Sequence, residues 1–124
     1  MRELILVFMG GGLGSVIRFA MGRWINAFHN GTFPWGTLAV NVVACFLMGL
    51  LIGLADHKNM LSPSARVFWT VGFCGGFSTF SAFSAEALVL IQGGLQWSFV
   101  MYLLASLVLC VAGTYAGLSL GETL

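Results

Sequence analysis

The stretch GFCGGFSTFSAFSAE, residues 72–86, decides how this chain folds, because it places polar groups inside a segment long enough to cross a bilayer. It contains a glycine pair, several serine and threonine hydroxyls and a carboxylate. Backbone at membrane depth that is not helical must be buried in protein or line a water-filled cavity. Hydroxyls, free carbonyls and phenylalanine rings gathered at that depth indicate a path or binding site for a small ion.

The composition is that of an integral membrane protein. Of its 124 residues 59% are hydrophobic and 7% are charged, whereas soluble domains carry about 25% charged residues. A spanning helix needs about 20 mostly apolar residues, and four segments meet this requirement: 4–27, 36–55, 66–91 and 96–119. The sequence predicts one all-α transmembrane domain over residues 1–124. The net charge of +1 indicates no nucleic-acid partner.

Basic residues are almost evenly divided between the two membrane faces. One face carries Arg2, Lys58 and Arg66, and the other carries Arg18 and Arg23. Because an excess of Lys and Arg on the cytoplasmic side sets the topology, a chain without that excess is able to insert in both orientations. This balance permits a dual-topology protein and an antiparallel homodimer.

A second copy would also shelter polar groups that four helices leave exposed, such as Asn41, since these groups need partners or water inside the membrane. Glycines at four-residue spacing offer close-packed seams between helices. They are Gly49 and Gly53 in the second segment, and Gly113, Gly117 and Gly121 in the fourth. Packing within one subunit explains these glycines equally well.

The fourth segment repeats a polar or polarisable residue every four positions, at Tyr102, Ser106, Cys110 and Thr114. This spacing places the four side chains along one slowly turning helix face, where they would form a track for a desolvated ion. The alternative is that the hydroxyls bond carbonyls of their own helix four residues earlier. The spacing alone does not decide between the two.

In the third segment, the glycine pair followed by Ser78 and Thr79 predicts a helix break near Gly75–Thr79, which would free carbonyl oxygens to coordinate a cation. Three phenylalanines recur at three-residue steps around it: Phe77, Phe80 and Phe83. They form either a packing stripe or a set of rings whose positive edges favour an anion without trapping it.

Three further polar residues have two interpretations each. The amide N–H groups of Asn41 can bind an anion, and its carbonyl can bond backbone. Glu86 is either a functional carboxylate or one that reaches the interface. Arg18 either extends to the headgroups or raises the anion concentration in a vestibule.

No metalloprotease, redox, Walker or nucleophile motif is present, so the chain is not expected to be an enzyme. Its three cysteines are interpreted as small buried hydrophobes.

Three motifs resemble the small fluoride channels, the Fluc or CrcB family. They are GGLGSVIR at 11–18, GTLAVN at 36–41 and the long motif at 72–86, which is the most specific of the three. The resemblance covers essentially the full length. It implies an antiparallel dual-topology homodimer with two pores in the inner (plasma) membrane, which passively exports cytoplasmic fluoride and so lowers its toxicity.

The resemblance also implies a role for each matching residue. Asn41 would donate to fluoride, and the ring edges of Phe80 and Phe83 would line the pores with Ser81 nearby. The path would continue along Tyr102, Ser106 and Thr114. Arg18 and Glu86 would lie nearer the vestibules. The carbonyls of Gly75 and Ser78 from both subunits would hold a structural sodium ion, Na⁺, at the dimer centre.

Two positions depart from the family pattern. Ala82 stands where relatives often have threonine, and Cys110 where the track often has serine or threonine. Because a thiol is a poorer donor, slower conduction at most is expected.

Two other functions are possible for such a chain: a small multidrug-resistance-type proton-coupled exporter and a non-conducting structural subunit. The exporter would need a carboxylate embedded in the first segment, which has only Glu3 at its mouth.

Overall fold

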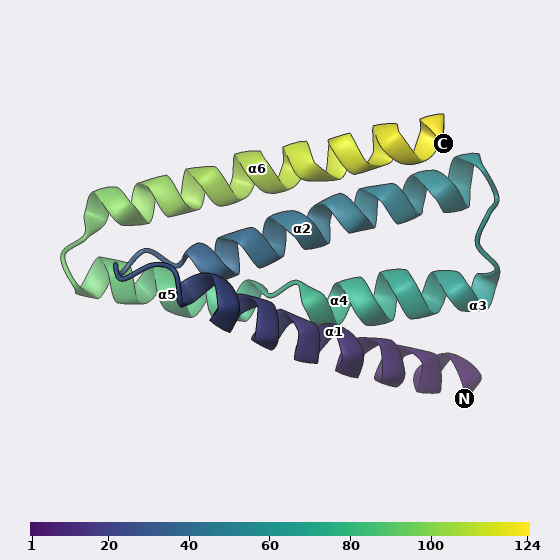
Figure 1. Ribbon diagram of the computed structural model, residues 1–124, viewed down its shortest axis with the longest axis horizontal. Helices are drawn as coiled ribbons and strands as arrows, with labels where there is room; N and C mark the ends of the chain where they lie inside the picture. The colour runs from purple at the N-terminus through teal and green to yellow at the C-terminus, as the bar shows by residue number, and fades with distance from the viewer.

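The computed structural model describes residues 1–124 and is helical apart from short loops and one break (Figure 1). The first span is α1 (Arg2–Asn26), and the second is α2 (Trp35–Ile52), which continues as π-helix over Gly53–His57. The third consists of α3 (Pro63–Arg66), a π-helical segment (Val67–Cys74), α4 (Gly75–Phe77) and α5 (Phe80–Gln92). The fourth is α6 (Gln96–Thr123).

All four spans are long and apolar enough to cross a membrane: Arg2–Asn26, Trp35–His57, Pro63–Gln92 and Gln96–Thr123. This confirms the predicted four-helix fold, with bounds that differ from the predicted ones by a few residues. Local signals explain the entry to the third span, where the Ser62 hydroxyl accepts a hydrogen bond from the Ala65 N–H at 3.1 Å and caps the helix. The pairing of two copies stays a prediction.

The third span is broken within the predicted window, but not at its glycines. Ser78 and Thr79 are extended, with φ/ψ of −78°/157° and −150°/115°, whereas the glycine pair is helical. A methyl group on Gly76 would overlap the backbone of Gly11 in α1. At least one glycine of the pair therefore serves close helix packing, and the break follows it.

The glycine seams predicted from four-residue spacing join helices of the same chain. A methyl group on Gly49 would overlap the Thr114 carbonyl oxygen, and one on Gly117 would overlap that of Phe46. The interpretation as packing within one subunit is thus confirmed for the α2–α6 seam. Any second copy must be held by another surface.

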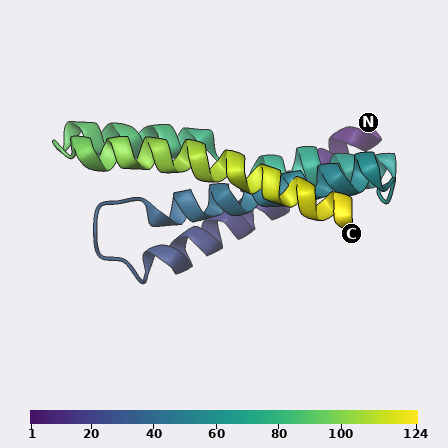
Figure 2. The ribbon, with the colours of Figure 1, turned by 90° about the horizontal axis from the view of Figure 1, so that it is seen from above.

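The helices pair α1 with the third span and α2 with α6 (Figure 1). Both termini lie at one end of the bundle, and Figure 2 shows the α1–α2 and α5–α6 hairpins diverging at the other end. Little of the chain is covered: only 6% of the most apolar stretch of α6 is buried. Such an apolar surface requires lipid or another protein surface against it.

Candidate functional site

The centre of the site is an amide that replaces the missing helical hydrogen bonds at the break. Asn41 of α2 accepts from the Thr79 N–H at 2.8 Å through Oδ1, and its Nδ2 donates to the Thr79 carbonyl at 3.1 Å. Thr79 in turn caps α5, since its hydroxyl oxygen accepts from the Ala82 N–H at 3.1 Å. One of the two Asn41 N–H donors is therefore committed to backbone, and the other remains free to bind a ligand.

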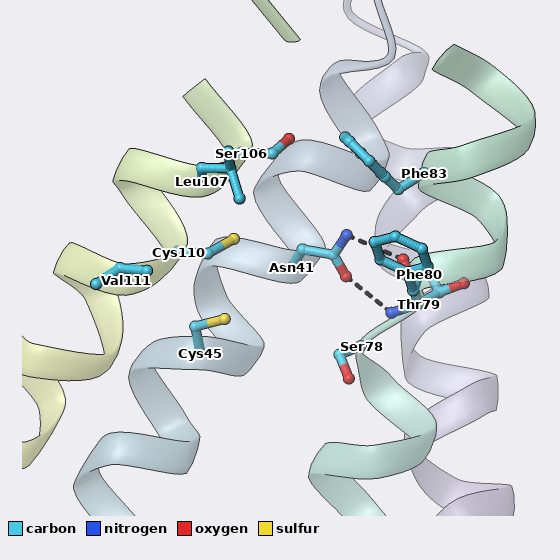
Figure 3. A pocket seen from close by; sticks show the side chains of 10 residues that line it. All are labelled: Asn41, Cys45, Ser78, Thr79, Phe80, Phe83, Ser106, Leu107, Cys110 and Val111. Carbon is cyan, nitrogen blue, oxygen red and sulfur yellow. Dashed lines mark hydrogen bonds between the residues drawn. The ribbon is translucent and has the colours of Figure 1, made fainter. Parts of the chain in front are cut away.

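Beside this amide lies an open cavity of about 260 Å³ between α2, the break and α6. Figure 3 shows the side chains that line it: Asn41, Cys45, Ser78, Thr79, Phe80, Phe83, Ser106, Leu107, Cys110 and Val111. None of them is charged. The cavity thus brings together most of the predicted ion-path residues in a neutral, mainly apolar setting.

The phenylalanines divide between two roles. Phe77 is buried in a core cluster against Phe73, so the packing interpretation holds for it. Phe80 and Phe83 line the cavity with ring centroids 5.5 Å apart. Phe80 is 78% exposed, so one wall of the cavity is open in a single chain.

Two hydroxyls of the polar track are buried without a hydrogen-bond partner. They belong to Tyr102, whose ring lies 4.9 Å from that of Phe83, and to Ser106, which lines the cavity. A buried unsatisfied polar group costs about 1–3 kcal/mol, so such groups point to a ligand or water that completes them. These two hydroxyls are the donors that a small anion would need beside the phenylalanines.

Three of the predicted path residues do not line the cavity: Tyr102, whose ring packs against Phe83, and also Thr114 and Ser81. The Thr114 hydroxyl donates to the Cys110 carbonyl four residues earlier at 3.1 Å, as the alternative interpretation of the repeat predicted. Ser81 is exposed, and its hydroxyl lies 3.3 Å from that of Thr79. The structure therefore groups Tyr102 and Ser106, but not Thr114 or Ser81, with the phenylalanines.

Glu86 lies on α5 beyond the cavity, toward the α1–α2 loop. Its Oε1 accepts a hydrogen bond of 2.5 Å from the Thr37 hydroxyl, and no cation pairs with it. It lines a second cavity of about 320 Å³ with loop residues such as His29 and Thr32. The carboxylate is therefore half-buried near the end of the bundle that carries the α1–α2 loop.

Arg18 extends toward the break from the opposite side. Its Nε donates to the Gly76 carbonyl at 3.2 Å, and the Ser15 hydroxyl lies 3.5 Å from the same oxygen. Arg18 also lines a third cavity of about 220 Å³ together with Arg23 and Asn26. One freed carbonyl of α4 is thus satisfied by α1, a contact that sequence reasoning missed.

Other freed carbonyls at the break remain available. The oxygens of Gly75 and Ser78 accept no hydrogen bond, while the Ser78 hydroxyl donates to the Cys74 carbonyl at 3.0 Å. Unpaired carbonyl oxygens are the ligands that alkali cations take in membrane proteins. The donor set therefore fits the predicted sodium ion, although one chain supplies only part of a coordination shell.

Sequence reasoning also missed Thr37, Thr79 and Cys45. The sequence held a signal for each of them. Thr37 and Cys45 stand four residues before and after Asn41 and share its helix face. Thr79 directly precedes an apolar helix, where threonine is a preferred cap.

Comparison with known proteins identifies the relatives of this chain. The family described as CrcB-like protein, Camphor Resistance (CrcB), matches residues 5–118. Proteins named fluoride-specific ion channel FluC are similar over their full length. That of Agrobacterium fabrum is 44% identical and covers 100% of this chain and 99% of the relative; that of Phocaeicola vulgatus is 42% identical, covering 98% and 100%. A third, from Geobacter sulfurreducens, is 40% identical over 95% of both chains. These relatives are named as ion channels and not as enzymes.

Proposed function

Because this chain belongs to the CrcB family of membrane proteins and its relatives are named as fluoride-specific channels, we propose that it conducts fluoride passively out of the cell. The observation that carries the proposal is a pair of buried, unpartnered hydroxyls: that of Ser106, which lines the cavity, and that of Tyr102, whose ring packs against Phe83. Fluoride is a small anion that accepts hydrogen bonds strongly, so neutral donors at membrane depth are suited to replace its water.

The proposed route runs through the cavity at the helix break. The free N–H of Asn41 and the hydroxyls of Ser106 and Tyr102 act as donors, and the rings of Phe80 and Phe83 offer their positive edges. No lysine or arginine lines this cavity. Neutral donors bind the ion strongly enough to admit it and weakly enough to release it, which conduction requires.

Two charged residues lie outside this neutral cavity. Arg18, on the other face of the third span, lines the third cavity with Arg23 and raises the anion concentration there. Glu86, bonded to Thr37, lies close to where the ion leaves the α5–α6 hairpin; Ser81 and Thr114 are peripheral to the route. The membrane potential then drives the anion outward with about 2.3 kcal/mol per charge per 100 mV.

The working unit is an antiparallel homodimer with two pores. The open wall at Phe80 and the uncovered face of α6 support this proposal, because both require a covering surface. The balanced distribution of basic residues permits the opposite insertion that the pairing needs. The α2–α6 glycines are already occupied within one chain, so the broken third span and the outer face of α6 form the contact.

Sodium would join the two broken spans through the carbonyls of Gly75 and Ser78 from each copy. Its contribution there would be electrostatic: the cation would be coordinated by carbonyl oxygens that the break has left without hydrogen-bond donors. Asn41 and Arg18 satisfy the neighbouring carbonyls, which leaves these two for the ion.

Reconstitution tests the proposed function directly. Purified protein in liposomes loaded with potassium fluoride is expected to release fluoride to an electrode when valinomycin supplies the counter-current, and to retain chloride under the same conditions. Vesicles that keep their fluoride, in the presence of folded dimeric protein, would contradict the proposal.

A further inference from the structure

Two thiols face the central cavity from neighbouring helices. Cys45 on α2 and Cys110 on α6 both line it, both are free, and Figure 3 shows both sulfur atoms turned toward its interior. The third cysteine, Cys74, is packed in the core and lines no part of the cavity.

Backbone packing holds this thiol pair in place. A methyl group on Gly113 would lie 3.3 Å from the Val42 carbonyl oxygen, and one on Gly49 would overlap the Thr114 carbonyl oxygen. The two helices are thus in backbone contact about one turn from each thiol. Their separation is therefore fixed before any ligand binds, which lowers the cost of binding.

The surroundings decide which ion such a pair would accept. No third His, Cys, Asp or Glu is placed to complete a larger metal site, and no charged side chain lines the cavity. Thiolates select soft metals, and a net charge at membrane depth is costly. Two thiolates neutralise a divalent ion but leave a net negative charge with a monovalent one.

We propose that Cys45 and Cys110 form a two-coordinate site for a soft divalent cation of the mercuric type. On binding, each thiol gives up its proton to water and each sulfur forms one bond to the metal, so Hg²⁺ and two thiols yield a neutral dithiolate and two protons. The Ser106 hydroxyl, one helical turn away and without a partner, faces the same cavity. The expected obstruction of flux rests on the route proposed above; the metal site itself does not.

The test uses the reconstituted full-length protein and mercuric chloride. Intact-mass measurement and counting of alkylatable thiols after denaturation report binding, and fluoride efflux reports obstruction. Wild type and the control variant Cys74→Ala are expected to bind one mercury per chain and to stop conducting. Cys45→Ala and Cys110→Ala are each expected to lose apparent affinity by roughly 10²–10⁴-fold, because the second thiol acts at high effective concentration.

Three results are decisive. Equal mercury binding by wild type and the Cys45→Ala/Cys110→Ala double variant would overturn the proposal, as would protection of only one thiol per metal. Silver binding as tightly as mercury would overturn the charge argument and with it the assignment to a divalent ion. Mercury bound to both thiols with undiminished fluoride flux would support the site and place the fluoride route elsewhere.

Discussion

The third span has two different faces at the same membrane depth. Toward α1 it is closed: Gly76 packs against Gly11, and its carbonyl accepts from Arg18. Toward α2 and α6 it is open, with a cavity and with buried hydroxyls, such as that of Ser106, that have no partner. One face satisfies its polar groups within the chain and stabilises the fold, whereas the other leaves them for a ligand. Substitutions on the two faces should therefore change different measurements.

The largest effect is expected for the rings of the open face. Replacing Phe80 or Phe83 with isoleucine keeps apolar volume but removes the positive ring edge. We expect fluoride efflux from liposomes to fall by about a hundredfold, which corresponds to a barrier raised by about 2.7 kcal/mol. Phe77→Ile is the matched control, because Phe77 is buried in the core; it should lose stability and keep its flux per folded dimer. Normal conduction by both test variants would refute the ring-edge mechanism.

The next effect concerns the amide that joins α2 to the break. Asn41→Asp keeps an acceptor for the Thr79 N–H but removes both amide donors and adds a negative charge. We expect flux to fall by at least about tenfold, one factor of ten for each 1.36 kcal/mol of barrier. Asn41→Ala, which also loses both bonds to Thr79, should additionally lower thermal stability in detergent. If the aspartate variant conducts like wild type, Asn41 is only a structural clamp.

A substitution on the closed face should affect stability and not conduction. Gly76→Ala forces a methyl group into the backbone of Gly11, and overpacking of this kind costs about 1–3 kcal/mol. Thermal stability followed by size-exclusion chromatography should fall, while flux per folded protein is retained. Gly12→Ala is the control, since open space surrounds that position. Unchanged stability in Gly76→Ala would mean that the α1 contact is looser than described.

These contrasts show what the sequence could and could not predict. Hydropathy and length gave the four spans, and the polar content of residues 72–86 gave the break, because lipid leaves few solutions for polar backbone. The sequence could not show which helix the glycines pack against, since four-residue spacing is the same whether Gly49 contacts α6 of its own chain or a second copy. The Asn41–Thr79 and Arg18–Gly76 contacts join distant parts of the chain, and local patterns do not encode them.

The polar track was predictable as a helix face but not as a set of contacts. Tyr102 and Ser106 recur at the same interval as Thr114, yet only the first two hydroxyls lack a partner. Whether a hydroxyl turns to its own helix or to a cavity depends on the neighbouring helix, which periodicity does not specify. The helix face followed from the spacing, and the individual contacts required the structure.

The unpartnered hydroxyl of Ser106 should give a smaller effect, with opposite signs for stability and for fluoride flux. Ser106→Ala removes an unsatisfied buried group, so stability should stay constant or rise by about 1 kcal/mol. Flux should fall several-fold, because the ion loses a donor. Thr114→Ala is the matched control: its hydroxyl bonds its own helix, so flux should hardly change. A fall in stability for Ser106→Ala would indicate that this hydroxyl has a structural partner.

The smallest effect is expected where this chain departs from its family pattern. Cys110 lines the cavity one turn from Ser106, and a thiol is a weaker donor than a hydroxyl. Cys110→Ser should therefore raise fluoride efflux by at most about threefold, which corresponds to about 0.6 kcal/mol, near the low end of the roughly 0.5–1.5 kcal/mol that a neutral hydrogen bond is worth. Efflux rates compared at equal dimer content measure this change. An unchanged rate would mean that the ion passes this position without a rate-setting contact, and the donors beside Phe83 would then limit conduction.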